Sequence, residues 1–228
     1  PANPSSLYKE GVKAKKALHD ARTSIAQFFS VQPDEIIFTS GGTESNSLAF
    51  QGVLNALSVD DTPRPHFIIS TIEHPSIVEI ALDLTSRGYD VSFVPVNKDG
   101  IVDPKDIKKA LRPETVLVSV MFANNEIGTI QPIKDIAREV RHYKKSLGRA
   151  TGEYPYMHTD ACQAVLFEDM RIPSLGVDLL SVDGGKIYGP RGMGVLMKRR
   201  HVDLEPVFLG GSQEFGLRAG TENLPSII

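Results

Sequence analysis

Short apolar stretches alternate with amphipathic stretches along most of this chain. Between Leu7 and Phe28 the apolar residues recur every three or four positions, with Lys and Asp between them, which predicts an amphipathic helix that packs on a surface. The β-rich run 35–39 then predicts a strand. The Gly-rich break 40–45 predicts a tight turn, and the stretch up to Leu57 predicts a second helix.

The same alternation continues towards the C-terminal end. Further strands are predicted at 67–70, 91–96, 116–120, 156–160, 177–182 and 194–197, and further helices at 77–86, 104–111 and 132–147. Strands that alternate with helices form a largely parallel sheet with helices on both faces. Because no repeat, low-complexity tract or long linker divides the sequence, we expect one α/β domain over residues 1–228.

Composition narrows the class of protein. The chain has 228 residues, of which 41% are hydrophobic and 23% charged, as in ordinary soluble globular proteins. A formal net charge of -3 offers no basic excess for a nucleic-acid backbone, and the apolar runs are too short to cross a bilayer. The single cysteine, Cys162, excludes an internal disulfide framework and fits a reducing compartment, so we expect a cytoplasmic protein.

The two ends of the sequence suggest a piece of a longer protein. The chain starts at Pro1 without an initiator Met, and an apolar segment is just beginning at 224–228. We therefore expect a domain that is incomplete at both ends.

Candidate chemistry lies in the turns that follow the predicted strands, because ligands of parallel sheets bind beyond the carboxyl ends of strands. Gly42 and Thr43 follow a strand and precede a helix, so their N–H groups and the Thr43 hydroxyl point to an anion such as a phosphate. An equally good interpretation is a tight turn with Thr43 as the helix N-cap. No Lys stands in the P-loop position, which argues against a nucleoside triphosphate site.

Lys186 and Asp160 each end a predicted strand, and one crossover between them would bring their side chains together. An amine partly shielded from water suits Schiff-base chemistry, although most lysines are simply solvated. A buried carboxylate needs a cationic partner, for which a pyridinium nitrogen would serve. His74 follows a third strand and is placed to stack on a flat ring or to pass protons. A metal site is not predicted, and Cys162 is expected to be a small buried residue rather than a nucleophile.

Taken together, these turns resemble the cysteine desulfurase and selenocysteine lyase family, in the class V aminotransferase group of pyridoxal-phosphate (PLP) enzymes. The resemblance is collinear over nearly the whole chain. It rests on the segments 3–6, 38–45, 73–74, 124–128, 160–163, 186–190 and 218–223.

This resemblance implies a PLP-dependent large domain of fold type I with a defined cofactor site. Lys186 would form the internal aldimine, Asp160 would pair with the pyridine nitrogen and Gln163 with the phenolic oxygen of the ring, and His74 would stack on the ring. Gly42 and Thr43 would bind the phosphate, and Asn125 would face the ring oxygen and the substrate. Thr221 would reach the phosphate of a neighbouring subunit in a homodimer.

The implied reaction releases sulfur from L-cysteine and leaves alanine, for transfer to an acceptor protein as in iron–sulfur cluster assembly. In the family the nucleophilic cysteine and the arginine that holds the substrate carboxylate come later, beyond Ile228, so residues 1–228 alone are expected to be inactive. The family usually has Ser and His where this chain has Asp183 and Gly185, and an Asp carboxylate repels a phosphate. The alternatives are another class V aminotransferase or lyase, including a selenocysteine lyase, and a non-catalytic PLP-fold module.

Overall fold

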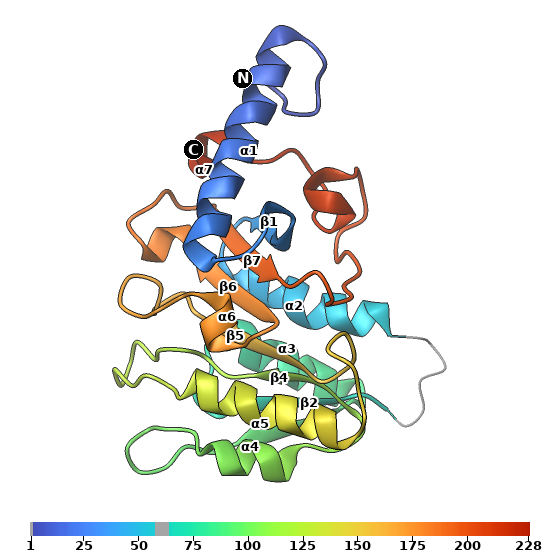
Figure 1. Ribbon diagram of the computed structural model, residues 1–228, viewed down its shortest axis with the longest axis vertical. Coiled ribbons are helices and arrows are strands. Elements are labelled where there is room, and N and C mark those ends of the chain that lie inside the picture. Colours follow the sequence, from blue (N-terminus) through green and yellow to red (C-terminus); the bar gives the residue numbers. More distant parts are fainter. Residues whose placement is uncertain (1, 58–63) are drawn as a thin grey trace.

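A computed structural model describes residues 2–57 and 64–228 of the chain, and these residues form a single seven-stranded sheet with helices packed around it (Figure 1). The order of the strands across the sheet is β1-β7-β6-β5-β4-β2-β3. The strands are β1 (Ile36–Thr39), β2 (His66–Ser70), β3 (Asp90–Val94), β4 (Thr115–Ser119), β5 (Tyr156–Asp160), β6 (Leu179–Asp183) and β7 (Gly194–Lys198). The α/β class and the largely parallel sheet predicted from the sequence are confirmed.

The helices connect the strands much as the hydrophobic pattern predicts, with ends shifted by a few residues. The α-helices are α1 (Lys9–Phe29), α2 (Gly42–Ala56), α3 (Pro75–Ser86), α4 (Pro104–Ala110), α5 (Ile133–Ser146), α6 (Ile172–Leu175) and α7 (Leu224–Ile227). Short 3-10 turns are η1 (Pro33–Glu35), η2 (Gly184–Lys186) and η3 (Gln213–Gly216). The sequence pattern missed the last two α-helices and the three turns, because four residues or fewer show no periodicity.

Strand β7 runs against the rest of the sheet. The pairs β2–β3, β2–β4, β4–β5 and β5–β6 are all parallel, whereas β7 is antiparallel to both of its neighbours, β6 and β1. Strand β1 therefore points the same way as the parallel strands. Its carboxyl end, and those of β2, β4, β5 and β6, open on the same edge of the sheet, which is where a parallel sheet binds its ligands.

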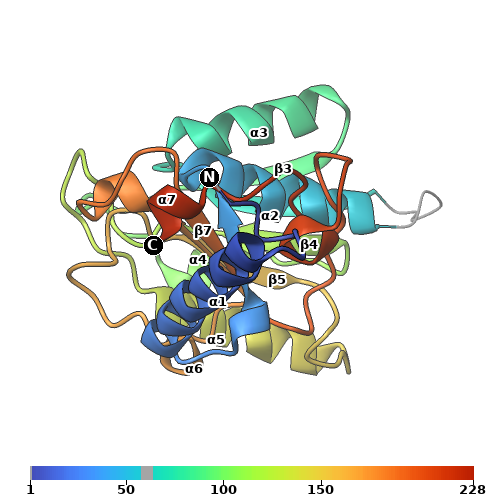
Figure 2. The same cartoon turned by 90° about the horizontal axis from the view of Figure 1, so that it is seen from above.

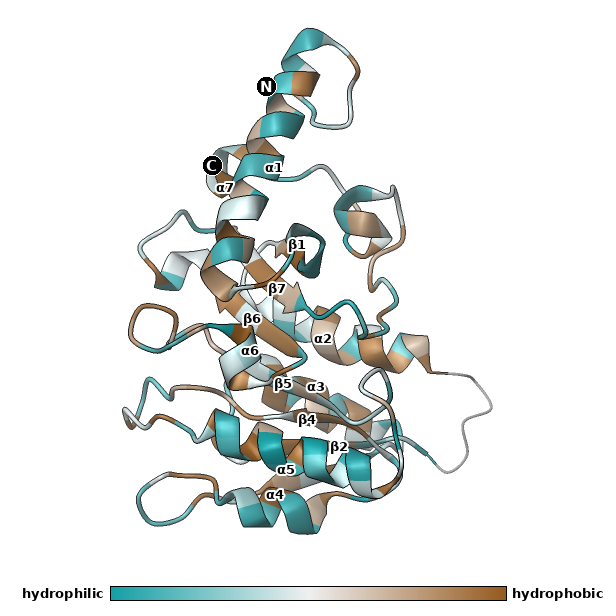
Figure 3. Cartoon of the chain, viewed as in Figure 1, coloured by the Kyte–Doolittle hydropathy of each residue, from teal (hydrophilic) through white to brown (hydrophobic). Residues whose placement is uncertain are grey.

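Two hydrophobic cores cover the two faces of the sheet. One joins Leu18 of α1, Ile107 of α4 and Ile136 of α5, and the other joins Leu48 of α2 and Ile77 of α3. Viewed from above, α2 and α3 lie on one side of the sheet and α5 and α6 on the other (Figure 2). Apolar residues fill the strands while the outer surface of α5 is hydrophilic (Figure 3), so burial on both faces holds the sheet edge rigid.

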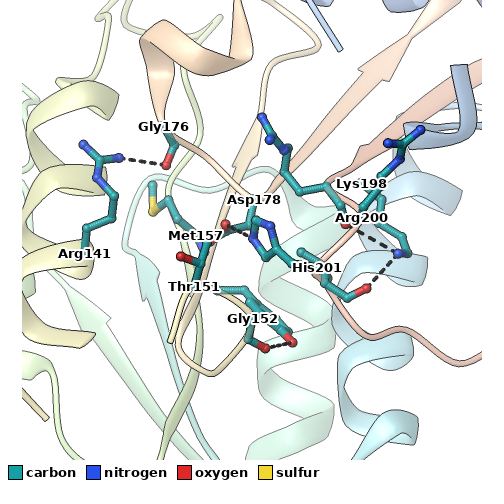
Figure 4. Close-up of polar contacts among 12 residues, drawn as sticks. Arg141, Thr151, Gly152, Met157, Gly176, Asp178, Lys198, Arg200 and His201 are labelled. Atoms are coloured by element: carbon teal, nitrogen blue, oxygen red, sulfur yellow. Dashed lines mark hydrogen bonds and ion pairs between the residues drawn. The ribbon is translucent and has the colours of Figure 1, made fainter. Parts of the chain in front are cut away.

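The end of the sheet remote from the ligand-binding edge is tied together by polar side chains (Figure 4). Asp178 accepts a hydrogen bond from the Met157 backbone at 2.8 Å and is hydrogen-bonded to His201 Nε2 at 2.8 Å. Arg141 of α5 donates to the carbonyl oxygen of Gly176 at 3.0 Å. These contacts fix the start of β6 against β5, so the carboxyl ends of the two strands keep a constant relation to each other.

A buried ion pair anchors the C-terminal segment to α1. Arg22 is 7% exposed, and its guanidinium contacts both oxygens of the Glu214 carboxylate at 2.6 and 2.7 Å. Glu214 also accepts a hydrogen bond from the backbone of Phe38 in β1 at 2.7 Å. In the described part of the chain no helix is long and apolar enough to cross a membrane.

Candidate active site

One pocket at the ligand-binding edge of the sheet gathers nearly all the site residues predicted from the sequence. It lies where β5 and β6 end and α2 and α3 begin. Its lining residues are Gly42, Thr43, His74, Ser76, Met121, Ala123, Asn125, Asp160, Cys162, Gln163, Asp183 and Lys186. Seven of the eight predicted residues therefore meet at one place. Thr221 is exposed outside the pocket of this chain, and its predicted contact with a neighbouring subunit stays a prediction.

The register of the sheet explains why Asp160 and Lys186 meet. Strands β5 and β6 are parallel neighbours, with Asp160 level with Ser181, so the turn after β6 lies beside the end of β5. Lys186 closes the 3-10 turn η2 directly after β6. The crossover inferred from the sequence is the one observed.

Lys186 is less shielded than we expected from its apolar strand. The residue lines the pocket but is exposed to solvent. The turn carries Lys186 past the end of the sheet, into the largely exposed segment 187–192. The amine is therefore accessible to a ligand that enters from solvent.

Asp160 is the buried charge of the pocket. Its residue is 7% exposed, and its two oxygens accept hydrogen bonds from Asn46 Nδ2 at 2.8 Å and from the Cys162 backbone at 2.9 Å. Both contacts fix the direction of the carboxylate. A buried carboxylate held in this way favours a cationic partner on its free side.

Asn46 links Asp160 to His74 through a chain of hydrogen bonds that the sequence analysis missed. The Asn46 amide, fully buried in α2, donates to Asp160 and also to Ser76 Oγ at 2.9 Å. Ser76 in turn lies 2.9 Å from His74 Nδ1, which also accepts from the Ser76 backbone at 3.1 Å. Because Nδ1 accepts, the proton of the neutral imidazole sits on Nε2. A polar Asn on an otherwise apolar helix face was the signal that could have revealed this link.

Two buried titratable groups near Asp160 carry no charge at neutral pH. Burial raises the pKa of Glu73 to about 8, and the nearby Asp160 carboxylate adds to the effect. Burial lowers the pKa of His158 to about 4, and its ring joins Ser119 to Ser181 across three strands. Glu73 therefore adds no second negative charge beside Asp160.

Cys162 lines the pocket, and its thiol is not activated. Burial raises the pKa of its thiol well above the usual range, with the Asp160 carboxylate contributing in the same direction. A methyl group on Gly42 would lie 2.6 Å from the Cys162 sulfur, so the start of α2 packs directly on this side chain. The sequence predicted a small buried residue, whereas Cys162 is half-buried at the pocket wall.

The residues suit a flat, cationic ring better than a metal ion. Of the described residues, no three His, Cys, Asp or Glu side chains are placed to hold a metal ion. The pocket offers a buried carboxylate, an imidazole with a fixed tautomer and an accessible amine, which fit the pyridine nitrogen, the ring face and the aldehyde of PLP. At the start of α2, however, the Gly42 N–H already donates to Asp183.

Comparison with known families decides the relationship. The family model described as "Aminotransferase class-V" matches residues 1–228. The chain belongs to the class-V aminotransferase family. A protein named cysteine desulfurase IscS from Dictyoglomus turgidum is 45% identical over 226 residues, which cover 99% of this chain and 54% of that protein.

Three further similar proteins carry other names. A selenocysteine lyase from Bos taurus is 42% identical over 99% of the chain and 56% of its own length. A solved structure titled "SspA in complex with cysteine" has a TM-score of 0.89 at 36% identity, covering 99% of this chain and 62% of that one. A structure titled "NIFS-LIKE PROTEIN" has a TM-score of 0.90 at 35% identity, and the match covers 99% of this chain and 59% of that one. The chain thus spans little more than half the length of the curated relatives.

Proposed function

We propose that this chain is the cofactor-binding large domain of a PLP-dependent cysteine desulfurase, which converts L-cysteine into alanine and a transferable sulfur atom. The observation that carries the proposal is the meeting of Asp160 and Lys186 in one pocket, beside the start of α2. The relatives named cysteine desulfurase support the choice of reaction. The cytoplasmic location, the homodimer, the acceptor protein and iron–sulfur cluster assembly belong to the same proposal.

When bound, PLP would withdraw electrons from the substrate carbons and so allow sulfur to leave the β-carbon. The residues of the protein would bind and orient the cofactor and would carry out the proton transfers. Asp160, fixed by Asn46 and the Cys162 backbone, would keep a proton on the pyridine nitrogen. Lys186 would hold the aldehyde carbon and, once displaced by the substrate amine, would serve as the nearby base.

The remaining lining residues would position the two ligands. His74 presents an imidazole whose Nδ1 is occupied by Ser76, so its ring is held in one orientation for stacking. Gln163 and Asn125, both in the lining, would bind the ring oxygen and the substrate. Gly42 and Thr43 line the end of the pocket where the phosphate would lie, and Thr221 would reach the phosphate of a neighbouring subunit.

The proposal is tested by trapping the cofactor on the full-length protein. After incubation with PLP and reduction with borohydride, peptide mass spectrometry should find the pyridoxyl group on Lys186. The Lys186→Ala variant is the matched control, and it should remain unlabelled at this peptide and lose alanine formation by at least about a thousandfold. Labelling at another lysine in the wild type would contradict the proposal.

Selenocysteine lyase is a second candidate, because the bovine relative with that name is almost as similar to this chain as the desulfurases. Comparing kcat/KM for L-cysteine and L-selenocysteine separates the two activities. Production of alanine and sulfide from cysteine supports the desulfurase, whereas turnover of selenocysteine alone supports the lyase. PLP bound at Lys186 without turnover of either amino acid would support the non-catalytic alternative.

A further inference from the structure

Asp183 occupies the anion-binding end of the pocket with its own carboxylate. The residue ends β6, and its side chain bends towards the start of α2. Oδ2 accepts a hydrogen bond from the Gly42 backbone N–H at 3.1 Å, and Oδ1 accepts one from the Gly185 N–H at 2.8 Å. Two backbone donors that a ligand would need are therefore already used within the chain.

The Gly42 N–H is among the donors best suited to an anion in this pocket. It belongs to the first turn of α2, a helix of 15 residues, where N–H groups lack partners inside the helix and the helix dipole is positive. Gly42 packs closely on Cys162, since an added Cβ would lie 2.6 Å from its sulfur, and Gly42 also lines the pocket. The position that suits a phosphate is the one that the Asp183 carboxylate fills.

The Asp183 carboxylate takes part in no ion pair within residues 2–57 and 64–228. Among the residues with described positions, no Lys or Arg forms an ion pair with this carboxylate, although Lys186 lines the same pocket. Its negative charge is met by the two N–H groups and the end of α2. A phosphate brought to the same donors would face this charge at short range, or would need the side chain to turn away and give up both hydrogen bonds.

We propose that Asp183 acts as an internal substitute for the cofactor phosphate, so that this pocket holds the ring of PLP firmly and gains little affinity from its phosphate. The inference rests on the proposed PLP site and concerns only its phosphate end. It predicts that pyridoxal, which has the same ring and aldehyde and no phosphate, binds nearly as tightly as PLP. Replacing Asp183 with an uncharged residue should free the donors and restore the contribution of the phosphate.

The experiment measures the dissociation constants of PLP and pyridoxal for the full-length protein by calorimetric titration. The variants are Asp183→Ser, which opens the space, and Asp183→Asn, which keeps the shape and removes the charge. Asp203→Asn is the matched control, because Asp203 is exposed and follows β7, at the other end of the sheet. Each variant is compared with the wild type by the ratio of the two constants.

We expect both Asp183 variants to bind PLP at least about tenfold more tightly, with pyridoxal affinity changed by less than about twofold. Asp203→Asn should change neither constant. An unchanged ratio of PLP to pyridoxal affinity in the two Asp183 variants would overturn the inference and leave the proposed function intact. If neither ligand binds to any form of the protein, the proposed function fails, and the inference fails with it.

Discussion

Two aspartates end neighbouring strands and line the same pocket, yet their surroundings differ. Asp160, at the end of β5, is buried and is held by a side-chain amide and one backbone N–H, with a free side towards the pocket. Asp183, at the end of β6, is half-buried and satisfies both oxygens with backbone N–H groups. One carboxylate is arranged to attract a cation, and the other fills a place suited to an anion.

The difference shows that the function of a carboxylate depends on the donors around it and not on its place in the sheet. At the Asp160 end, burial keeps Glu73 neutral and Asn46 relays contacts to Ser76, so a single negative charge is fixed in direction. At the Asp183 end, the dipole of α2 stabilises the charge instead. The first arrangement favours a pyridinium ring, and the second competes with a phosphate.

The substitution Asp160→Asn is expected to have the largest effect, and this effect is on the rate of alanine formation. The amide can still accept from the Cys162 backbone, but it removes the negative charge that would hold a proton on the pyridine nitrogen. We expect alanine formation to fall by about a hundredfold or more, with PLP still trapped on Lys186. Steady-state kinetics on the full-length protein check the prediction. A loss smaller than that caused by Asp183→Asn would reverse the roles assigned to the two residues.

The substitution Gly42→Ala is expected to lower stability. It tests how closely the start of α2 packs against the segment that follows β5. The added methyl group would lie 2.6 Å from the Cys162 sulfur, so we expect the free energy of unfolding to fall by about 1–3 kcal/mol. The paired change Gly42→Ala with Cys162→Ala removes the clash and should recover most of that loss. Urea denaturation of the four forms gives the coupling energy. Strictly additive losses of stability would show that the start of α2 does not pack against Cys162.

A third effect concerns the pH dependence of stability at the Asp160 end. The pKa of Glu73 is about 8 in the folded protein, against 4.5 for an ordinary Glu, so the native state binds the extra proton. Its contribution to stability is therefore fully present below about pH 4.5 and is lost as the pH rises to 8. Between pH 5 and pH 8 the wild type should lose about 3 kcal/mol of stability relative to Glu73→Gln.

Urea denaturation at several pH values measures this difference, and Glu79→Gln, an exposed change on α3, is the control. The control should follow the wild-type curve. Parallel curves for Glu73→Gln and the wild type would mean that Glu73 is ionised when folded. The Asp160 end would then carry two charges, and the contrast with Asp183 would be weaker.

The sequence predicted the helices and strands that have a clear hydrophobic pattern. It also predicted which residues in the turns after the strands belong to the site. Buried runs such as the one ending at Asp160 can be recognised as strands, and parallel strands bring their ends to one edge, so seven of the eight predicted residues could be placed in one pocket. The antiparallel direction of β7 could not be inferred, because strand direction depends on pairing partners and leaves no trace in the hydrophobic pattern.

What the sequence could not provide is the direction of individual side chains. The exposure of Lys186 depends on where a three-residue turn ends, and the role of Asn46 depends on which side of α2 faces β5. Asp183 was recognisable as an unusual residue beside a predicted phosphate site. That its carboxylate contacts Gly42 and Gly185 could be learned only from the folded structure.

We infer that Asp160 and Lys186 hold opposite sides of one pyridine ring, and the protonation state of the ring nitrogen is the sharpest test of this arrangement. Full-length protein loaded with PLP labelled with nitrogen-15 in the ring would be studied by NMR, with Asp160→Asn as the comparison. We expect a protonated ring nitrogen in the wild type and loss of that proton in the variant, with the cofactor on Lys186 in both. A nitrogen with the same chemical shift in both proteins would contradict it.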